Sequence, residues 1–298
     1  MCIRDRINVP RDYWTQVIDI ELPTIIRMER PSGGAQAIKN ASALLSNAKF
    51  PVILSGAGVI LADAINECKA LAEKLDAPVA CGYQHNDSFP GSHPLAVGPL
   101  GYNGSKAGME IISKADVVLA LGTRLNPFST LPGYGIDYWP KQASIIQVDI
   151  NSDRIGLAKK VSVGICGDAK LVAQQILSQL SSDAGDKGRE DRKAFIHKTK
   201  SAWLQTLTSL DHEEDDPGTT WNEDSRKRDP DRMSPRMAWR AIQAGLPKDA
   251  IISSDIGNNC AIGNAYPTFE KGRKYLACLL YTSPSPRDAT LSRMPSSA

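Results

Sequence analysis

The sequence predicts an α/β protein with a doubly wound parallel sheet, followed by the truncated start of a second α/β domain. Three observations lead to this prediction. Short apolar runs alternate with segments of helical periodicity, the runs end in glycine or small polar residues, and a new helix–strand pattern begins near residue 234. Strands that alternate with amphipathic helices are typical of parallel sheets. The strands of such sheets are covered on both faces, so they read as continuous apolar runs.

The first half of the predicted sheet domain contains two helices, two strands and a long loop. Apolar residues recur at helical spacing over residues 37–48 and again over 65–75, which predicts a helix in each place. The run PVILS at 51–55 ends at a glycine and predicts a buried strand, and residues 78–81 predict the next one. The Gly- and Pro-rich residues 82–104 predict a long loop.

The second half repeats this alternation. Apolar runs predict three more strands, at residues 116–121, 144–149 and 161–166. Apolar residues at helical spacing predict helices over residues 105–113 and 172–180.

The composition of the chain changes after this domain. Asp, Glu, Lys and Arg dominate residues 182–233, which predicts a charged linker with one helix over about 192–207. A serine followed by Pro235 is a favourable helix start, so a helix is predicted up to Gly245. Ile251 and Ile252 then begin a strand.

Length and charge exclude several classes of protein. The 298 residues, of which 42% are hydrophobic, suffice for about two domains at roughly 150 residues each. The net charge of +2 gives no one-signed field, so neither a nucleic-acid partner nor a membrane partner is expected. No apolar run reaches the ~18 residues of a membrane span, and the N-terminus lacks an apolar signal segment. The six scattered cysteines form no C-x-x-C pair, which indicates reduced thiols in a cytoplasmic protein and no metal site.

Ligands of doubly wound sheets lie at the carboxyl ends of the strands. Small polar or glycine residues occupy four such ends, at Gly56–Gly58, Gly82–Asn86, Gly122–Asn126 and Asp149–Asn151. Gly56–Gly58 either presents N–H groups to a phosphate or forms a plain tight turn, because Leu61 replaces the third glycine of a dinucleotide fingerprint. Asp149 either holds a ribose hydroxyl or caps a helix. Arg124 either pairs with an anionic ligand or forms a surface ion pair.

Two loop histidines and one strand end are further candidates. His85 and His93 lie in the Gly-rich loop and could exchange protons near neutral pH. The segment Asp255–Asn259 follows a strand, so Gly257 would allow close backbone approach and the amides of Asn258 and Asn259 could donate to a phosphate. The alternative is a simple turn at the strand end.

Several of these segments together resemble the sulfoacetaldehyde acetyltransferase family of the thiamine-diphosphate superfamily, which also contains acetolactate synthase. The resemblance rests on PRDYW, GYQHND, FPGSHPL, GPLGYNG, LGTRLNPFSTLPGYGIDYWP, QVDIN, DDPGTTW and SSDIGNNCAIGNAYP, and it covers residues 7–277. It implies the following division: an artefactual head with the end of a pyrimidine-binding domain (1–20), a Rossmann-like central domain (21–182), a charged linker (183–233), the start of a diphosphate-binding domain (234–277) and a foreign disordered tail (278–298).

The resemblance also implies the chemistry of a full-length parent enzyme. That enzyme would convert sulfoacetaldehyde and phosphate to acetyl phosphate and sulfite, using thiamine diphosphate and Mg²⁺, as a homodimer or homotetramer. Gly257, Asn258 and Asn259 would bind the diphosphate, while His93 and Asn103 would face the substrate, the latter within the segment Gly98–Gly104.

Parts of the family's machinery do not occur in this sequence. The resemblance assigns the activating glutamate to another part of the first domain and the magnesium motif to a Gly-Asp-Gly…Asn run, which this chain lacks. We therefore expect the chain itself to be inactive. The resemblance implies a central domain that binds FAD in acetolactate synthases; because the Gly-x-Gly turn is incomplete here, we expect that site to be unoccupied or vestigial. The alternatives are an acetolactate-synthase-like carboligase acting on pyruvate, and a non-catalytic nucleotide-binding module.

Overall fold

The computed structural model describes residues 10–21, 24, 26, 29–101, 104–210, 235–254, 262–263 and 265–277. The chain forms two compact units, Met1–Arg30 and Pro31–Ala298. In the described part of the first unit, a single 3-10 turn, η1 (Arg11–Thr15), is exposed along its length.

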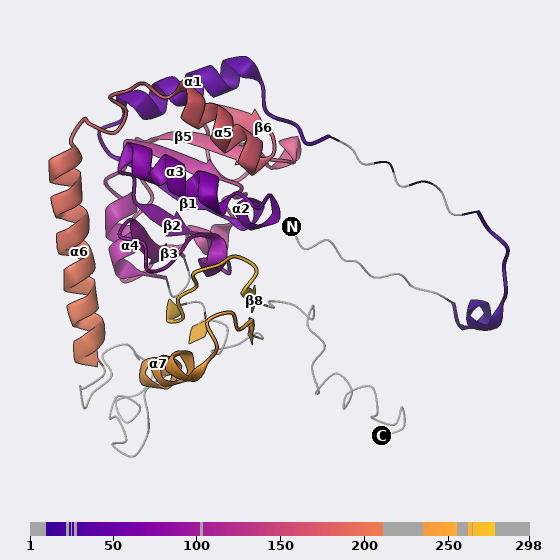
Figure 1. Ribbon diagram of the computed structural model, residues 1–298. Helices are drawn as coiled ribbons and strands as arrows, with labels where there is room; N and C mark the ends of the chain where they lie inside the picture. Colours follow the sequence, from indigo (N-terminus) through magenta and orange to yellow (C-terminus); the bar gives the residue numbers. More distant parts are fainter. Residues whose placement is uncertain are drawn as a thin grey trace. The chain divides into compact units, whose positions relative to one another are not determined.

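A six-stranded sheet forms the centre of the second unit (Figure 1). All the neighbouring strands are parallel, in the order β3 (Ala96–Pro99), β2 (Val79–Cys81), β1 (Pro51–Ser55), β4 (Val117–Leu121), β5 (Ser144–Asp149) and β6 (Val163–Cys166). The strand order reverses direction between β1 and β4. The structure thus confirms the predicted doubly wound parallel sheet, and this reversal is where such folds open a crevice.

Helices cover both faces of the sheet. One face carries α1 (Ala35–Asn47), α3 (Ile65–Leu75) and α5 (Ala169–Gln179); α1 and α3 each contact α5, and the short α2 (Ala57–Leu61) contacts α3 and α5. The opposite face carries α4 (Lys106–Ile112) and α6 (Arg189–Leu210), which also contact each other.

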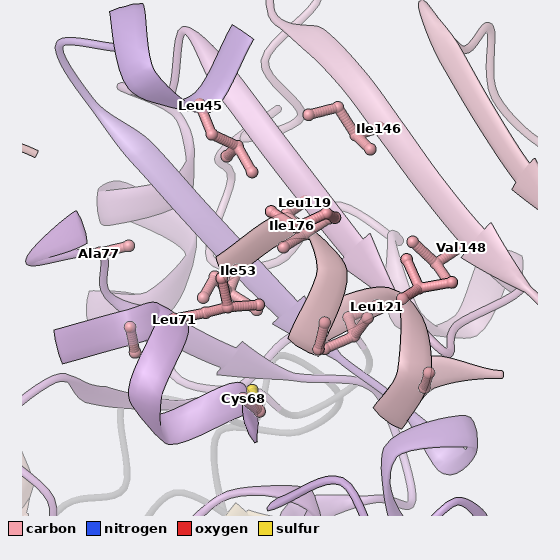
Figure 2. Packing of buried hydrophobic residues seen from close by; sticks show 14 of the residues in the cluster. Leu45, Ile53, Cys68, Leu71, Ala77, Leu119, Leu121, Ile146, Val148 and Ile176 are labelled. Atoms are coloured by element: carbon pink, nitrogen blue, oxygen red, sulfur yellow. The ribbon is translucent and has the colours of Figure 1, made fainter. Parts of the chain in front are cut away.

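Alternate residues of β1 and β4 enter two separate cores. Figure 2 shows the first core, where sheet residues meet helix residues: Ile53, Leu119, Leu121, Ile146 and Val148 from strands, and Leu45, Leu71 and Ile176 from helices. The intervening residues Val52, Leu54 and Val118 belong to the second core, with Met109 of α4 and Ile196 of α6. Because both faces are buried, β1 and β4 are apolar at nearly every position.

The prediction of an uninterrupted loop over residues 82–104 is wrong. The structure contains the 3-10 turn η2 (Asn86–Ser88) and the edge strand β3 in this stretch. Gly98 has φ +87° and Pro99 lacks an N–H group, and the pairing of β3 with β2 shifts register between Val79 and Ala80. Glycine and proline usually indicate a loop, but both are tolerated in irregular edge strands. Gly98 and Pro99 therefore lie in a strand here.

The charged segment after α5 is attached to the sheet domain through Arg192. Its buried guanidinium donates five hydrogen bonds, to the carbonyl oxygens of Lys49, Leu75, Asp76, Gly185 and Lys187, over 2.5–3.0 Å. Burial lowers the pKa of Arg192 from its ordinary value. The start of α6 is therefore packed against the C-terminal end of α3, although its composition is typical of a solvated linker.

A second, smaller group of elements follows. Helix α7 (Pro235–Gly245) agrees with the predicted helix, and β7 (Ile252–Ser254) with the predicted strand. Strand β8 (Tyr275–Ala277) pairs with β7 in parallel, with Ile252 opposite Tyr275. Ile251 and Leu276 are exposed by 62% and 56%. Parallel strands are normally covered on both faces, whereas these two residues, in and beside the pair, are exposed.

Over the described ranges, none of the helices combines the length and the apolarity that crossing a lipid bilayer requires.

Candidate functional site

The reversal point between β1 and β4 is closed by contacts between glycines. The Gly58 N–H donates to the Gly122 carbonyl oxygen over 2.8 Å, and a Cβ atom on Gly58 would lie 2.6 Å from the Gly122 Cα. Gly122 itself has φ +61°. These glycines are needed because two backbones approach each other, which favours the tight-turn interpretation of Gly56–Gly58 over phosphate binding.

Asp149 and Asn151 form local caps. The Asp149 Oδ1 accepts the N–H of Asn151 over 2.9 Å, and the Asn151 side chain accepts the N–H of Asp153 over 2.9 Å. The second bond caps the 3-10 turn η4 (Ser152–Arg154). This geometry favours the capping interpretation over ribose binding.

The loops that follow β2, β3 and β4 are joined around Ser129. Its Oγ accepts the N–H of Tyr83 over 3.0 Å, and its carbonyl oxygen accepts the hydroxyl of Tyr138 over 3.4 Å. Gly101, after β3, packs directly on the backbone of Phe128 and Ser129, next to the 3-10 turn η3 (Pro127–Ser129). Gly101, which belongs to the segment predicted to border the substrate, is thus held in place by the loop after β4.

Aromatic side chains make further contacts close to Ser129. The Tyr83 ring stacks on the Phe128 ring at 6.2 Å between centroids, and Phe128 is half exposed. The Tyr134 hydroxyl donates to the Gly104 carbonyl oxygen over 2.9 Å and its ring meets Trp203 of α6 edge-on. These contacts connect the segment Gly98–Gly104 with α6.

The structure places His93 inside a hydrogen-bonded group. Its Nδ1 accepts the N–H of Leu95 over 3.2 Å, so the neutral ring carries its proton on Nε2, which lies 3.3 Å from the Glu73 carboxylate of α3. The edge of the ring contacts Phe89. Both ring nitrogens are thus engaged within the sheet domain, and His93 stabilises the approach to β3.

The structure describes the second loop histidine, His85, but not all of the other predicted site residues. Burial lowers the pKa of His85, and the charge of Arg124 acts in the same direction. A neutral imidazole is therefore the dominant form of His85 near pH 7. The four remaining predicted site residues, Asn103, Gly257, Asn258 and Asn259, lie outside the described residues.

A cavity of about 290 Å³ lies between the sheet domain and the second group of elements. Its walls come from the β2–β3 edge (Cys81, Asn86, Phe89, Gly91, Ala96, Gly98, Pro99, Ser105), from α6 (Trp203, Leu204, Leu207), from α7 (Arg236, Arg240) and from Ala265, Tyr266, Pro267, Thr268 and Phe269. Among the described residues that line it are two guanidinium groups, and none of these residues carries a carboxylate. Arginines beside aromatic rings are suited to a small anion with an apolar part.

The cavity could not be predicted from the sequence, because its walls come from separate segments with no common motif. The Gly- and Pro-rich composition of residues 82–104 indicated a functional loop. It did not indicate which other segments form the remaining walls of the cavity.

The described residues offer no set of metal ligands. No group of three or more His, Cys, Asp or Glu side chains gathers among them. Asp168 follows a glycine, but its Oδ1 accepts the N–H groups of Lys170 and Leu171 at the start of α5. Asp168 is therefore the N-cap of α5.

We expect the described cysteines to differ strongly in reactivity. Burial raises the pKa of both Cys68 and Cys81 to about 12, whereas Cys166 is exposed. Only a thiolate is nucleophilic, so iodoacetamide at pH 8 should modify Cys166 at least about tenfold faster than the other two. Peptide mass spectrometry after timed quenching measures this. Equal rates at Cys68 and Cys166 in the folded chain would contradict the buried position of Cys68.

Comparison with known proteins identifies the family. Residues 38–176 match the family model "Thiamine pyrophosphate enzyme, central domain". A Rhizobium meliloti (strain 1021) protein named "Probable sulfoacetaldehyde acetyltransferase" is 76% identical over 276 residues, covering 93% of this chain and 47% of that protein. The Roseovarius nubinhibens "Sulfoacetaldehyde acetyltransferase" is 76% identical over 272 residues, covering 91% and 45%.

A more distant group shares the same region. The "Acetolactate synthase large subunit" of Buchnera aphidicola subsp. Schlechtendalia chinensis is 32% identical over 244 residues, covering 82% of this chain and 39% of that protein. The chain thus spans about half the length of the first two curated relatives. The doubly wound sheet lies within the matched region. The segment 38–176 belongs to the central-domain family of thiamine pyrophosphate enzymes.

Proposed function

We propose that the chain is part of a thiamine-diphosphate-dependent acyltransferase that converts sulfoacetaldehyde and phosphate to acetyl phosphate and sulfite. The observation that carries this proposal is 76% identity to proteins named sulfoacetaldehyde acetyltransferase over more than nine tenths of the chain. Identity to the named acetolactate synthase is only 32%. The acyl-transfer function is therefore favoured over pyruvate carboligation.

The proposed cofactor contacts are Gly257, Asn258 and Asn259. They follow β7, and phosphate groups bind well at the carboxyl ends of parallel strands. When bound, thiamine diphosphate would supply a nucleophilic carbon and an electron sink. Mg²⁺ would be held by residues of the assembled enzyme other than those described here, and the proposed assembly is a homodimer or homotetramer.

The proposed substrate side is the segment Gly98–Gly104. Asn103 and His93 would face the substrate, and the N–H of Leu95 would hold the His93 ring in place. Sulfoacetaldehyde and phosphate are both anions, so Arg236 and Arg240 of the adjoining cavity would attract them on their approach. The free thiols of Cys68, Cys81 and Cys166 support a reducing, cytoplasmic compartment.

We expect the purified chain alone to release no sulfite from sulfoacetaldehyde in the presence of phosphate, thiamine diphosphate and Mg²⁺. The reason is that no Gly-Asp-Gly run occurs in this sequence and that the resemblance assigns the activating glutamate to another part of the first domain. A sulfite-specific colorimetric assay measures the outcome. Turnover above a no-protein blank would show that the chain holds a complete active site.

The competing non-catalytic function has its own test. Isothermal titration of the chain with ADP, FAD and NAD would detect a nucleotide-binding module. We expect no saturable binding, because the backbone contact between Gly58 and Gly122 occupies the place where a phosphate would approach the β1 end. Micromolar binding of any of the three would support that module instead.

A further inference from the structure

The contact between the sheet domain and β8 is centred on the buried side chain of Asp87. This residue belongs to η2, after β2, and is 2% exposed. Its Oδ2 accepts two backbone N–H groups, from Lys274 over 2.9 Å and from Tyr275 over 3.2 Å. Those residues lie at the start of β8, so one carboxylate oxygen fixes the position of this strand.

The same residue, Lys274, continues the connection to β7. Its carbonyl oxygen accepts the N–H of Ile252 over 2.8 Å, at the first residue of β7. A continuous path therefore runs from Asp87 Oδ2 through the peptide groups of Lys274 to the backbone of β7. Two residues beyond Ile252, strand β7 ends at Ser254, and in the sequence the proposed diphosphate contacts begin three residues later, at Gly257.

Neighbouring contacts dock the chain just before Lys274. The Gly91 N–H donates to the Phe269 carbonyl oxygen over 2.8 Å, and the Ser92 hydroxyl donates to the Glu270 carboxylate over 2.7 Å. At Gly272 a Cβ atom would lie 2.7 Å from the Ile65 side chain. These bonds hold the approach to β8, but none of them reaches β7 directly.

We propose that Asp87 is a positioning residue for β7: by accepting the N–H groups of Lys274 and Tyr275, it sets the place of β7, the strand that precedes the proposed cofactor contacts in the sequence, against the central domain. The inference rests on the proposed function for what the segment after β7 binds. The hydrogen-bonded path itself is independent of any ligand. A buried carboxylate fits this role because its bonds to N–H groups are charge-assisted and directional.

The test is amide hydrogen exchange of the whole chain, resolved by residue with NMR, in Asp87→Ala and Asp87→Asn variants. Asp87→Ala should speed exchange at Lys274, Tyr275 and Ile252 by about tenfold or more, because the acceptor is lost and its effect passes to β7. The amide of Leu119 in β4 should not change, because the central sheet is unaffected. Asp87→Asn keeps an acceptor oxygen and should preserve protection at Ile252 to within about threefold.

A matched control removes a different bond of the same contact. Ser92→Ala deletes the hydroxyl bond to Glu270 and should leave exchange at Ile252 unchanged. The inference is overturned if Asp87→Ala leaves Ile252 unchanged, if Leu119 exchanges faster to the same extent, or if Asp87→Asn behaves as Asp87→Ala does. Because no cofactor is present, a failure to bind thiamine diphosphate would count against the proposed function only.

Discussion

Replacing Arg192 with methionine is expected to destabilise the sheet domain by about 3–5 kcal/mol, since a buried charged donor with many partners is removed. The Arg192 side chain is 1% exposed, and each of its five donated hydrogen bonds goes to a backbone carbonyl. Two of those carbonyls, at Leu75 and Asp76, belong to the end of α3. Methionine fills part of the volume but leaves these acceptors unpaired, and buried unpaired acceptors cost about 1–3 kcal/mol each.

The matched control is Arg189→Met, three residues earlier on α6. Arg189 is about one third exposed and pairs with Asp76 over 2.7 Å and with Asp186 over 2.9 Å. Ion pairs at this exposure contribute about 0–1 kcal/mol. Urea unfolding followed by circular dichroism compares the two variants. A shift for Arg192→Met no larger than that for Arg189→Met would contradict the role given to the buried guanidinium.

Replacing Gly101 with alanine is expected to cost about 2–5 kcal/mol, by adding left-handed backbone strain to overpacking. Gly101 has φ +84°, and a Cβ atom there would collide with the carbonyl oxygen of Phe128 and lie 2.8 Å from the Ser129 Cα. The obstacles are backbone atoms, so neither can rotate away. The junction of the three loops must open, and the Tyr83 N–H then loses its bond to Ser129.

Gly135→Ala separates the two contributions. Gly135 has φ +71°, but a Cβ atom there would meet nothing within 4 Å. This variant should show the backbone strain alone, about 1–2 kcal/mol. Thermal unfolding gives the stabilities, and exchange at the Tyr83 amide reports on the junction. Equal losses in both variants, with the Tyr83 amide still protected in Gly101→Ala, would contradict the described packing.

Much of the fold could be predicted because local patterns and tertiary packing agree. The runs 51–55 and 116–121 are apolar because both faces of β1 and β4 are buried, and helix α3 occupies the predicted residues 65–75. Strand β3 was missed because Gly98 and Pro99 break the pattern of a strand without preventing edge pairing. The role of Arg192 was missed because a buried arginine in a charged segment has no local signature.

The candidate site was harder to predict, because its features depend on contacts between distant segments. A glycine at a strand end indicates that other atoms approach the backbone closely, but it does not indicate whether those atoms belong to a ligand or to the chain itself. At Gly58 they belong to Gly122 of the same chain. His93 was singled out as an acid–base group, while its neighbour Asp87 was not weighed, although it is the buried carboxylate that reaches β8. The partner N–H groups lie almost 190 residues further along the chain.

The most direct test of the proposed acyl transfer is a chimeric enzyme. The matching region of the Rhizobium meliloti relative, which is 76% identical over 276 residues, would be replaced with this chain's residues 7–277. Sulfite release and acetyl phosphate formation would then be measured with sulfoacetaldehyde, phosphate and thiamine diphosphate. The account predicts release that depends on all three compounds. A folded chimera that released no sulfite, or that formed acetolactate from pyruvate instead, would contradict it.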